Sequence, residues 1–445
     1  VIIGPRSALF TPFPSLGLIV MDEEQENSYK SESTPKYHAR ETALEVAKLY
    51  GASVVLGSAT PSLEAYYRAG RGEYRLLQLT KRLTGGELPT VYTVDLRQEL
   101  QEGNRSIFSR KLQELMTDRL NKGQQTILFL NRRGYAGFVS CRSCGEVMKC
   151  PHCDVSLSEH KGGRLICHYC GYTQPMPKLC PKCGSKYILG FKAGTQQIEE
   201  KLKELYPGVR TLRMDADTTR TKDSYEKILS SFANGEADVL IGTQMIVKGH
   251  DFPKVTLVGI LAADLSLNAS DYRAGERTFQ LLTQAVGRAG RGVLPGEAVI
   301  QTYQPDHYAI TCAAAQDYES FYQEEILYRE LSGYPPVAHM LAVQIYGKEE
   351  ENAKQLALRL TDVVKSNMDF LSGKQKEQSN KKIQVLGPAP ANISKINDIY
   401  RYVFYVKHAE YDVLVEVKDR LEETLRQWQP RQMSIQFDFD PVSVL

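Results

Sequence analysis

Short apolar runs alternate with amphipathic stretches along most of the chain. Each run has the length of a strand, about 4–8 residues, and each stretch repeats its apolar residues at helical spacing. Strands that alternate with helices predict a parallel, doubly wound α/β sheet. We expect strands at residues 16–21, 52–56, 126–130, 209–214, 238–241, 255–261 and 298–303, and helices at residues 37–50, 111–120, 224–233 and 277–286.

The C-terminal part of the chain follows a different rhythm. A strand, a helix, two strands, a helix and a strand predict the ferredoxin-like order. That fold serves many purposes, so it indicates little about function. The expected strands are residues 339–346, 383–386, 402–406 and 434–439, the expected helices are residues 350–370 and 412–428, and residues 372–382 form a polar tether.

The composition is typical of a globular protein, because 42% of the 445 residues are hydrophobic and 24% are charged. A chain of this length predicts about three domains. No apolar run is long enough to span a membrane. The net charge of +2 indicates little about partners. Residues 81–105 are polar, with Gly85, Gly86 and Pro89, and are expected to form an irregular connection between domains.

Eight of the nine cysteines form four Cys-x-x-Cys pairs within one short segment. Each pair points two sulfurs at one metal, so the eight thiolates suffice for two tetrahedral zinc ions. Disulfides are the alternative, which a long chain without a secretory signal disfavours. All-thiolate zinc is typical of a structural site, so catalysis is sought elsewhere. The pairs are Cys141/Cys144, Cys150/Cys153, Cys167/Cys170 and Cys180/Cys183, and their spacing permits more than one way of sharing two ions.

The other candidate ligands near the cysteines are expected to be bystanders, since eight thiolates already complete two sites. These are His152, His160 and His168. The ninth cysteine, Cys312, is expected to be a buried core thiol. Thiols kept for metal rather than for disulfides indicate a reducing, cytoplasmic setting.

Acids follow the first predicted strand, at Asp22-Glu23-Glu24. Acids at the carboxyl end of a strand hold Mg²⁺ and activate water in open α/β sheets. Small hydroxyl residues follow the next strand, at residues 57–61, where they would couple to those acids. Farther on, Arg288 and Arg291 are spaced to reach the γ-phosphate of a nucleotide. Each segment alone could be a surface loop or an ion pair, but all three in this order favour a nucleotide site.

These segments resemble motifs II, III and VI of the superfamily 2 helicases. Joined to an eight-cysteine insertion, they are similar to the PriA family, the primosomal protein N′ helicases of bacterial replication restart. The resemblance covers nearly the whole chain. The matching segments are DEE at residues 22–24, GSATP at 57–61 and QAVGRAGRG at 284–292, with motif V at 242–253, motif Ib at 4–10 and motif IV at 126–136.

The resemblance implies the architecture of the chain. We expect two RecA-like helicase lobes, the first one partial, with an inserted two-zinc module and a C-terminal α+β ferredoxin-like domain. The expected parts are residues 1–85 (first lobe), 86–140 and 191–320 (second lobe), 141–190 (zinc insertion) and 321–445 (C-terminal domain). The family's zinc sites are nested, so the outer pairs Cys141/Cys144 and Cys180/Cys183 would hold one ion and the inner pairs Cys150/Cys153 and Cys167/Cys170 the other.

The family's ATP site carries over onto matching residues. Asp22 would help to hold Mg²⁺, and Glu23 would polarise the attacking water. Arg288 and Arg291 would reach the γ-phosphate from the second lobe. The remaining residues expected around ATP are Gly249, Asp251 and Gln284.

Expected DNA contacts come from the same resemblance. Thr60 would couple the state of ATP to DNA contact, and Arg6 belongs to the segment that resembles motif Ib. Tyr37 and Arg40 lie in a stretch that looks like the family's aromatic-rich loop, where side chains stack on single-stranded bases. The alternative for these residues, and for Tyr29 and His38 beside them, is an ordinary half-buried helix surface.

Two departures from the family pattern affect the expected activity. Gln25 stands where the family usually has histidine, so we expect altered coupling rather than lost activity. No GxxxxGK[ST] phosphate-binding loop occurs in the chain. Because Val1-Ile2-Ile3 also looks like the interior of a strand, we expect a truncated protein. Such a chain would bind zinc and DNA but hydrolyse ATP poorly or not at all.

The function implied by the resemblance is an ATP-dependent 3′ to 5′ DNA helicase of the cytoplasm and nucleoid. It would use zinc, ATP and magnesium, recognise stalled or D-loop forks, and initiate primosome assembly. Its expected partners are forked and single-stranded DNA, single-strand-binding protein, and the primosome and replicative-helicase loading proteins, with no membrane. The alternative is a non-catalytic, zinc-containing scaffold that binds fork DNA and recruits replication proteins. An RNA-processing zinc-ribbon protein would explain the cysteines but not the motifs.

Overall fold

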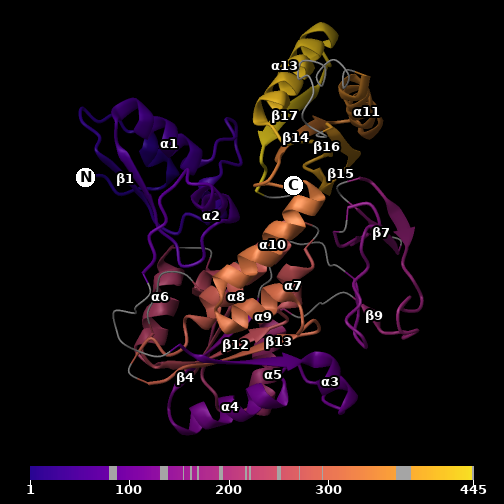
Figure 1. Ribbon diagram of the computed structural model, residues 1–445. Coiled ribbons are helices and arrows are strands. Elements are labelled where there is room, and N and C mark those ends of the chain that lie inside the picture. Colours follow the sequence, from indigo (N-terminus) through magenta and orange to yellow (C-terminus); the bar gives the residue numbers. More distant parts are fainter. Residues whose placement is uncertain are drawn as a thin grey trace. The chain divides into compact units, whose positions relative to one another are not determined.

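The chain divides into two compact units in the computed structural model (Figure 1). The first unit comprises Val1–Leu77, His168–Tyr172 and Ile326–Leu445, and the second comprises Gln78–Cys167 and Thr173–Glu325. None of the helices in the part of the chain that the structure describes is both long and apolar enough to cross a membrane. The structure describes residues 1–79, 88–130, 139–153, 155–160, 163–167, 170–189, 194–215, 218–219, 222–247, 252–269, 271–292, 294–366 and 382–442.

A six-stranded parallel sheet forms the centre of the second unit, which confirms the predicted doubly wound α/β fold. The central strand β4 (Gln125–Leu130) is buried throughout, which explains its unbroken apolar run. In order across the sheet, the strands are β10 (Thr211–Met214), β11 (Val239–Gly242), β4, β12 (Val255–Leu261), β13 (Glu297–Thr302) and β3 (Thr90–Asp95).

Helices cover both faces of this sheet (Figure 1). Leu112, Met116, Ile198 and Leu202 pack against the strands in one fully buried cluster, which places α4 and α5 on the same face. Two further helices, α8 and α9, lie on the opposite face. The helices of this unit are α3 (Leu96–Gln101), α4 (Arg110–Asn121), α5 (Thr195–Leu205), α6 (Lys222–Ala233), α7 (Asp264–Leu267), α8 (Ala274–Val286) and α9 (Tyr308–Ala315), with a 3-10 turn at Gln244–Val247 and α10 (Tyr318–Ser332) at its boundary.

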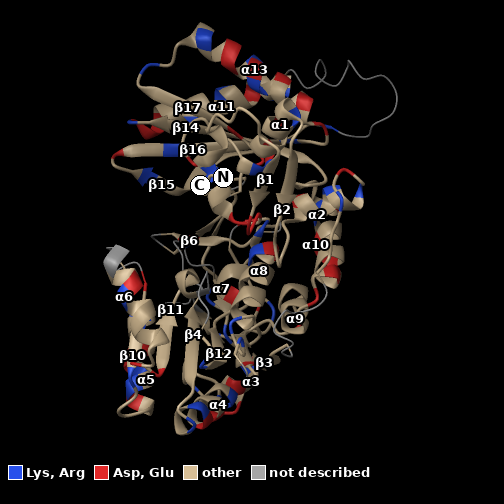
Figure 2. Cartoon of the chain, turned by 90° about the vertical axis from the view of Figure 1, so that its left-hand side faces the viewer, with Lys and Arg blue, Asp and Glu red and all other residues tan. Residues whose placement is uncertain are grey.

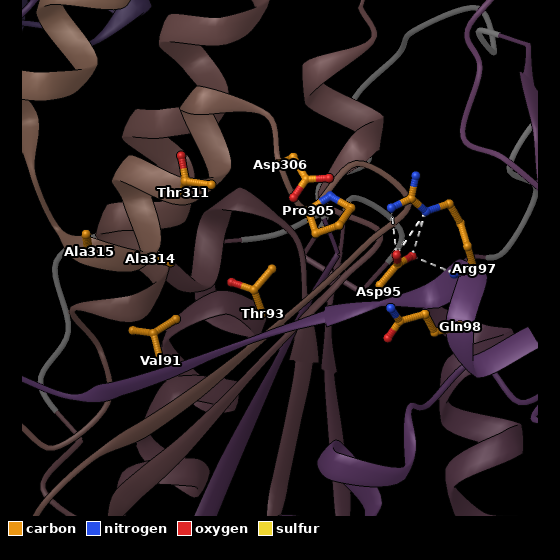
Figure 3. Close-up of a pocket in the computed structure, with 10 residues that line it drawn as sticks. All are labelled: Val91, Thr93, Asp95, Arg97, Gln98, Pro305, Asp306, Thr311, Ala314 and Ala315. Atoms are coloured by element: carbon orange, nitrogen blue, oxygen red, sulfur yellow. Dashed lines mark hydrogen bonds and ion pairs between the residues drawn. The ribbon is translucent and has the colours of Figure 1, made fainter. Parts of the chain in front are cut away.

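The prediction of an irregular connection at residues 81–105 was wrong for residues 90–101, and residues 81–87 lie outside the described part of the chain. Strand β3 and helix α3 occupy Thr90–Gln101, and β3 pairs with β13 in parallel register. The apolar signal is weak because β3 is an edge strand, and one of its faces lines an open cavity of about 640 Å³ (Figure 3). That face carries Val91, Thr93 and Asp95. Its two polar residues interrupt the apolar pattern from which a strand is predicted in the sequence.

The N-terminal part of the first unit is a small α/β element. Strands β1 (Leu18–Met21) and β2 (Ser53–Leu56) are parallel neighbours, as the apolar runs predicted. Helix α1 (Ala39–Tyr50) joins them, and its Ala39 and Ala43 pack against Met21. Helix α2 (Leu63–Gly70) follows β2, and 3-10 turns form at Arg6–Phe10 and Asn27–Tyr29.

The C-terminal part of the first unit is an antiparallel four-stranded sheet with two helices on it, which confirms the ferredoxin-like prediction. Both helices pack their apolar sides into one core with the sheet. Acidic and basic residues are interspersed along α13 (Figure 2), and Lys418 and Arg426 both pair with Glu422. The strands, in sheet order, are β15 (Gln384–Ile396), β16 (Ile399–His408), β14 (His339–Gly347) and β17 (Met433–Phe439), and the helices are α11 (Glu350–Ser366) and α13 (Tyr411–Trp428).

Candidate metal centres and nucleotide site

The eight paired cysteines gather into two groups of four. One group contains Cys141, Cys144, Cys180 and Cys183, and within each group all sulfur atoms lie within 4.8 Å of one another. All nine cysteines of the chain are free of disulfides. The arrangement is nested, with the second group between the two halves of the first in sequence. The second group consists of Cys150, Cys153, Cys167 and Cys170.

The sulfur positions fit zinc. Sulfurs at the corners of a zinc tetrahedron with bonds of about 2.3 Å lie roughly 3.8 Å apart. The Sγ atoms of Cys141 and Cys183 are 3.6 Å apart. The Sγ atoms of Cys144 and Cys180 are also 3.6 Å apart. Two cysteine-rich zinc centres are therefore part of this protein, and each is complete without a histidine ligand.

Short strands bring the cysteine pairs together. The outer group forms because β5 (Ser140–Cys141) pairs with β9 (Ile188–Leu189). The inner group forms around the antiparallel strands β6 (Ser158–His160), β7 (Arg164–Ile166) and β8 (Thr173–Pro175). A pairing between neighbouring Cys-x-x-Cys pairs, which spacing alone also permits, is not the one that these strands produce.

The outer zinc site is held against the sheet of the second unit. Arg97 Nη1 donates to the carbonyl of Cys144 (3.4 Å), and Asp95 fixes the Arg97 guanidinium (Figure 3). The Arg142 guanidinium lies 4.9 Å from the ring centroid of Tyr303, directly after β13. Gly145 packs so closely on Tyr303 that a β-carbon there would lie 2.5 Å from its carbonyl oxygen. These contacts were not predicted, although a glycine directly after a Cys-x-x-Cys pair was a visible signal.

We expect Gly145→Ala to destabilise the zinc module more than Gly184→Ala. Both glycines follow the second cysteine of an outer pair and have left-handed φ values of 77° and 71°. That conformation costs any other residue about 1–2 kcal/mol. A β-carbon at Gly184 meets nothing within 4 Å, whereas one at Gly145 collides with Tyr303. Thermal unfolding and the rate of zinc release to a chelator measure the difference, and equal effects of the two variants would contradict the docking contact.

Strands β1 and β2 bring the acidic segment and the GSATP segment together. Their last residues, Met21 and Leu56, are paired. Gly57 N donates to Met21 O (2.8 Å), and Glu24 N donates to Gly57 O (3.1 Å). Both segments therefore lie at the carboxyl edge of the same two strands, where open α/β sheets bind their ligands.

A chain of hydrogen bonds joins the exposed acids to the GSATP segment. Gln25 Nε2 donates to Glu23 Oε2 (2.6 Å), and Ser58 Oγ donates to Gln25 Oε1 (2.6 Å). Thr60 N in turn donates to Ser58 Oγ (2.9 Å). Glu23 itself has φ 49°, a strained conformation that is concentrated at functional sites. The amide of Gln25 thus bridges two segments with one donor and one acceptor.

Arg40 and Thr60, two predicted DNA contacts, lie inside the first unit. Arg40 Nη1 is 3.0 Å from Glu24 Oε2 and 2.7 Å from Ser62 Oγ, and Arg40 is 5% exposed. Ser62 N donates to Glu24 Oε1 (2.6 Å), so this buried pair ties the two segments together a second time. Thr60 is 1% exposed. Their contact with DNA stays a prediction that this arrangement does not support.

Arg6 and Tyr37, the other predicted DNA contacts, are half-buried. Arg6 contacts the loop that contains Tyr37, and Tyr37 contacts the segment that contains Arg6. Arg6 Nη1 donates to Ser28 O (2.6 Å) and to Lys30 O (3.3 Å). The ring of Tyr37 packs edge-on against Phe10, with centroids 5.1 Å apart. The structure therefore joins the motif Ib segment to the loop that precedes α1.

His38 begins α1, and we expect it to make the protein less stable in acid. Its Nδ1 accepts from Arg40 N (3.2 Å), and burial, then the charge of Arg40, lower its pKa to about 3. Unfolded histidine titrates near 6.5, so below that pH the unfolded state binds the proton first. Stability should then fall by about 1.4 kcal/mol per pH unit between pH 6.5 and 3. His38→Asn keeps a capping side chain and should flatten this part of the slope.

Denaturant unfolding at several pH values measures that slope. His307 caps α9 in the same way, and burial lowers its pKa to about 4. The His38→Asn variant therefore keeps the acid-dependent loss of stability that comes from His307 in the second unit. His307→Asn is therefore the matched comparison. If the His38→Asn protein loses stability in acid as steeply as the unsubstituted protein does, the burial of a neutral His38 is wrong.

The predicted phosphate-binding arginines follow helix α8. Gln284 lies in its last turn, and Arg291 is exposed, with Nε donating to Gly287 O (3.0 Å). Gly290 has φ 68°, and a β-carbon there would lie 2.4 Å from Gly296 N. This close crossing fixes the turn from which Arg288 and Arg291 project.

The other predicted residues are divided between the two units or lie outside the described part of the chain. Gly249, Asp251 and His168 lie outside the described residues. The acids Asp22 and Glu23 belong to the first unit, and the arginines of the α8 turn belong to the second. Each half of the expected ATP site is formed within its own unit, and their combination stays a prediction.

Three family models match successive parts of the chain. The PriA DNA helicase Cys-rich region matches residues 150–175. The helicase conserved C-terminal domain matches residues 179–293. The primosomal protein N C-terminal domain matches residues 330–442.

Curated relatives match over the whole chain. The replication restart protein PriA of Bacillus subtilis is 45% identical over 100% of this chain and 54% of its own length. That of Synechocystis is 42% identical over 100% of this chain and 53% of its own length. The chain thus spans about half the length of these relatives. A solved structure of RecG bound to a three-way DNA junction matches 73% of this chain and 30% of that chain, at 15% identity and with a TM-score of 0.33.

A parallel sheet that matches the helicase C-terminal model, two cysteine-rich zinc centres and an antiparallel C-terminal domain define a zinc-containing helicase-type protein. The helicase model and the cysteine-rich model are adjacent in this sequence, as the motifs predicted. The chain belongs to the PriA family of replication restart proteins.

Proposed function

We propose that this chain is the motor portion of an ATP-dependent DNA helicase that moves 3′ to 5′. It would recognise stalled or D-loop forks and begin primosome assembly. The observation that carries the proposal is the hydrogen-bonded chain from Glu23 through Gln25 to Ser58. These hydrogen bonds would let a change at the nucleotide alter the position of the segment that follows β2. A purely structural protein does not need such coupling.

The protein's residues take definite parts in the proposed reaction. Bound with Mg²⁺, ATP would supply the phosphoryl group whose transfer to water drives movement. Asp22 would hold the metal, while Glu23 would accept the proton of the attacking water. Arg288 and Arg291 would stabilise the charge that develops on the phosphoryl oxygens.

The two zinc centres have a structural role, not a catalytic one, in the proposed function. All four positions of each centre are filled by thiolates, so neither has an open position for a substrate. The Arg97 and Arg142 contacts make the outer centre an extension of the second-unit sheet. We assign it the role of a rigid projection that meets the fork and protein partners, which would include single-strand-binding protein and helicase loaders.

Binding of forked DNA by residues 1–445 tests the substrate class. Fluorescence anisotropy with a labelled fork and a labelled single strand should give binding that weakens as salt is raised, because phosphate contacts release counterions. Absence of binding to both probes at low salt would contradict the proposal. Binding together with a failure of any extended form of the chain to hydrolyse ATP would instead favour the scaffold.

A further inference from the structure

Two lysines from the loop before α1 converge on one aspartate of the C-terminal domain, all within the first unit. Lys30 Nζ is 2.8 Å from Asp438 Oδ1 and donates to Phe439 O (2.7 Å). Lys36 Nζ is 3.8 Å from Asp438 Oδ2 and donates to Gln344 Oε1 (2.8 Å). The three charged side chains are 6%, 3% and 7% exposed, in the order Lys30, Lys36 and Asp438.

This cluster holds more positive than negative charge. The Arg401 guanidinium lies 5.7 Å from the centroid of the Tyr346 ring, and the Tyr346 hydroxyl shares Gln344 Oε1 with Lys36. Burial lowers the pKa of Lys36 the most, and Asp438 opposes that effect. The charges of Lys30 and Arg401 lower the pKa further. Glu32 also opposes the lowering, but less than Asp438 does. Three positive groups, Lys30, Lys36 and Arg401, thus face the two carboxylates of Asp438 and Glu32, and burying such an excess of positive charge is costly unless another anion joins them.

The loop that carries these lysines is a closed element attached to the acidic segment. Ser31 N donates to Tyr37 O (2.8 Å), and Lys30 and His38 form an antiparallel bridge across its neck. Tyr29 OH donates to the carbonyl of Asp22 (2.8 Å) at its start. The loop is therefore one hydrogen-bonded element, and Tyr29 connects its start to the acidic segment of the proposed ATP site.

We propose that Asp438 occupies a site for nucleic-acid phosphate, and that single-stranded DNA displaces it from Lys30 and Lys36. Without DNA, the carboxylate of the C-terminal domain holds the loop and covers both lysines. With DNA, phosphate oxygens take its place, and the loop is released from β17. The contact is thus an autoinhibitory latch, and it rests on the proposed function because it needs DNA as the competing ligand.

The binding of a labelled single-stranded oligonucleotide to residues 1–445 tests the latch. Asp438→Asn removes the competing charge, so DNA should bind at least about threefold more tightly than to the unsubstituted chain. Lys30→Met/Lys36→Met should cancel this gain in the Asp438→Asn background. In the unsubstituted background the same pair should lower the slope of log Kd against log salt by about 1.4, since each phosphate contact contributes about 0.7 for a single strand.

Asp398→Asn is the matched control, because Asp398 is an exposed acid paired with Lys395 elsewhere on the same domain. If Asp398→Asn raises affinity as much as Asp438→Asn does, the latch is overturned and only general charge matters. An unchanged salt slope in Lys30→Met/Lys36→Met overturns it as well, even if Asp438→Asn fails to fold. DNA binding by the unsubstituted chain in those cases leaves the proposed function standing, whereas no DNA binding at all overturns both.

Discussion

Replacing Cys144 and Cys180 together by serine is expected to leave one zinc ion per chain, whereas replacing Cys144 and Cys150 together is expected to leave none. The first pair of substitutions removes two ligands from the outer group alone. The second pair removes one ligand from each group, and a zinc centre with three thiolates loses much of its binding free energy. Metal analysis of the purified variants by mass spectrometry counts the ions.

The two double variants separate the nested arrangement from its alternative. If neighbouring pairs shared an ion, Cys144 and Cys150 would belong to one site, and the outcomes of the two variants would be exchanged. Cys312→Ser is the control, because Cys312 lies on α9 and belongs to neither group. It should keep two ions per chain.

Glu23→Gln is expected to lower the rate of ATP hydrolysis about 100- to 10,000-fold, the usual contribution of a positioned general base. The amide is nearly the same shape but cannot accept the proton of the attacking water. Zinc content and DNA affinity should stay as they are. The measurement requires a form of the chain that hydrolyses ATP, namely residues 1–445 joined to a segment that carries a GxxxxGK[ST] phosphate-binding loop.

Glu45→Gln provides the control for this experiment. Glu45 is an exposed acid on α1 that pairs with Lys48, and its replacement should leave hydrolysis unchanged. Should Glu23→Gln retain the full rate while Glu45→Gln behaves as expected, the assignment of the acidic segment to catalysis is wrong.

Strands buried on both faces could be predicted from the sequence, whereas the edge strand could not. β4 and β12 are buried along their whole length and consist mainly of apolar residues, because helices cover both sides of them. β3 carries polar residues on the face that lines the cavity, so its pattern looked like a linker. The ferredoxin-like order was readable because α11 and α13 each present one apolar side to the same core.

The candidate site was predictable as a set of residues but not as a set of contacts. Residue types and spacing indicated the zinc ligands, but their grouping follows from strand pairing, which spacing does not determine. Arg40 looked like a DNA contact because arginine in an aromatic-rich loop suggests one, yet Glu24 holds it inside. The hydrogen bond from Lys30 to Phe439 O, beside the Lys30–Asp438 ion pair, joins residues 409 positions apart, and no local pattern signals such a contact.

The most direct test of the central claim is fork-stimulated ATP hydrolysis, measured on residues 1–445 alone and on the same residues joined to a segment that carries a GxxxxGK[ST] phosphate-binding loop. We expect no hydrolysis from the chain alone, and hydrolysis that rises on addition of forked DNA in the joined protein. That result would establish the acids after β1 and the arginines after α8 as parts of a DNA-driven motor. A joined protein that folds, binds zinc and retains fork DNA, yet does not hydrolyse ATP, would contradict the motor and identify a scaffold.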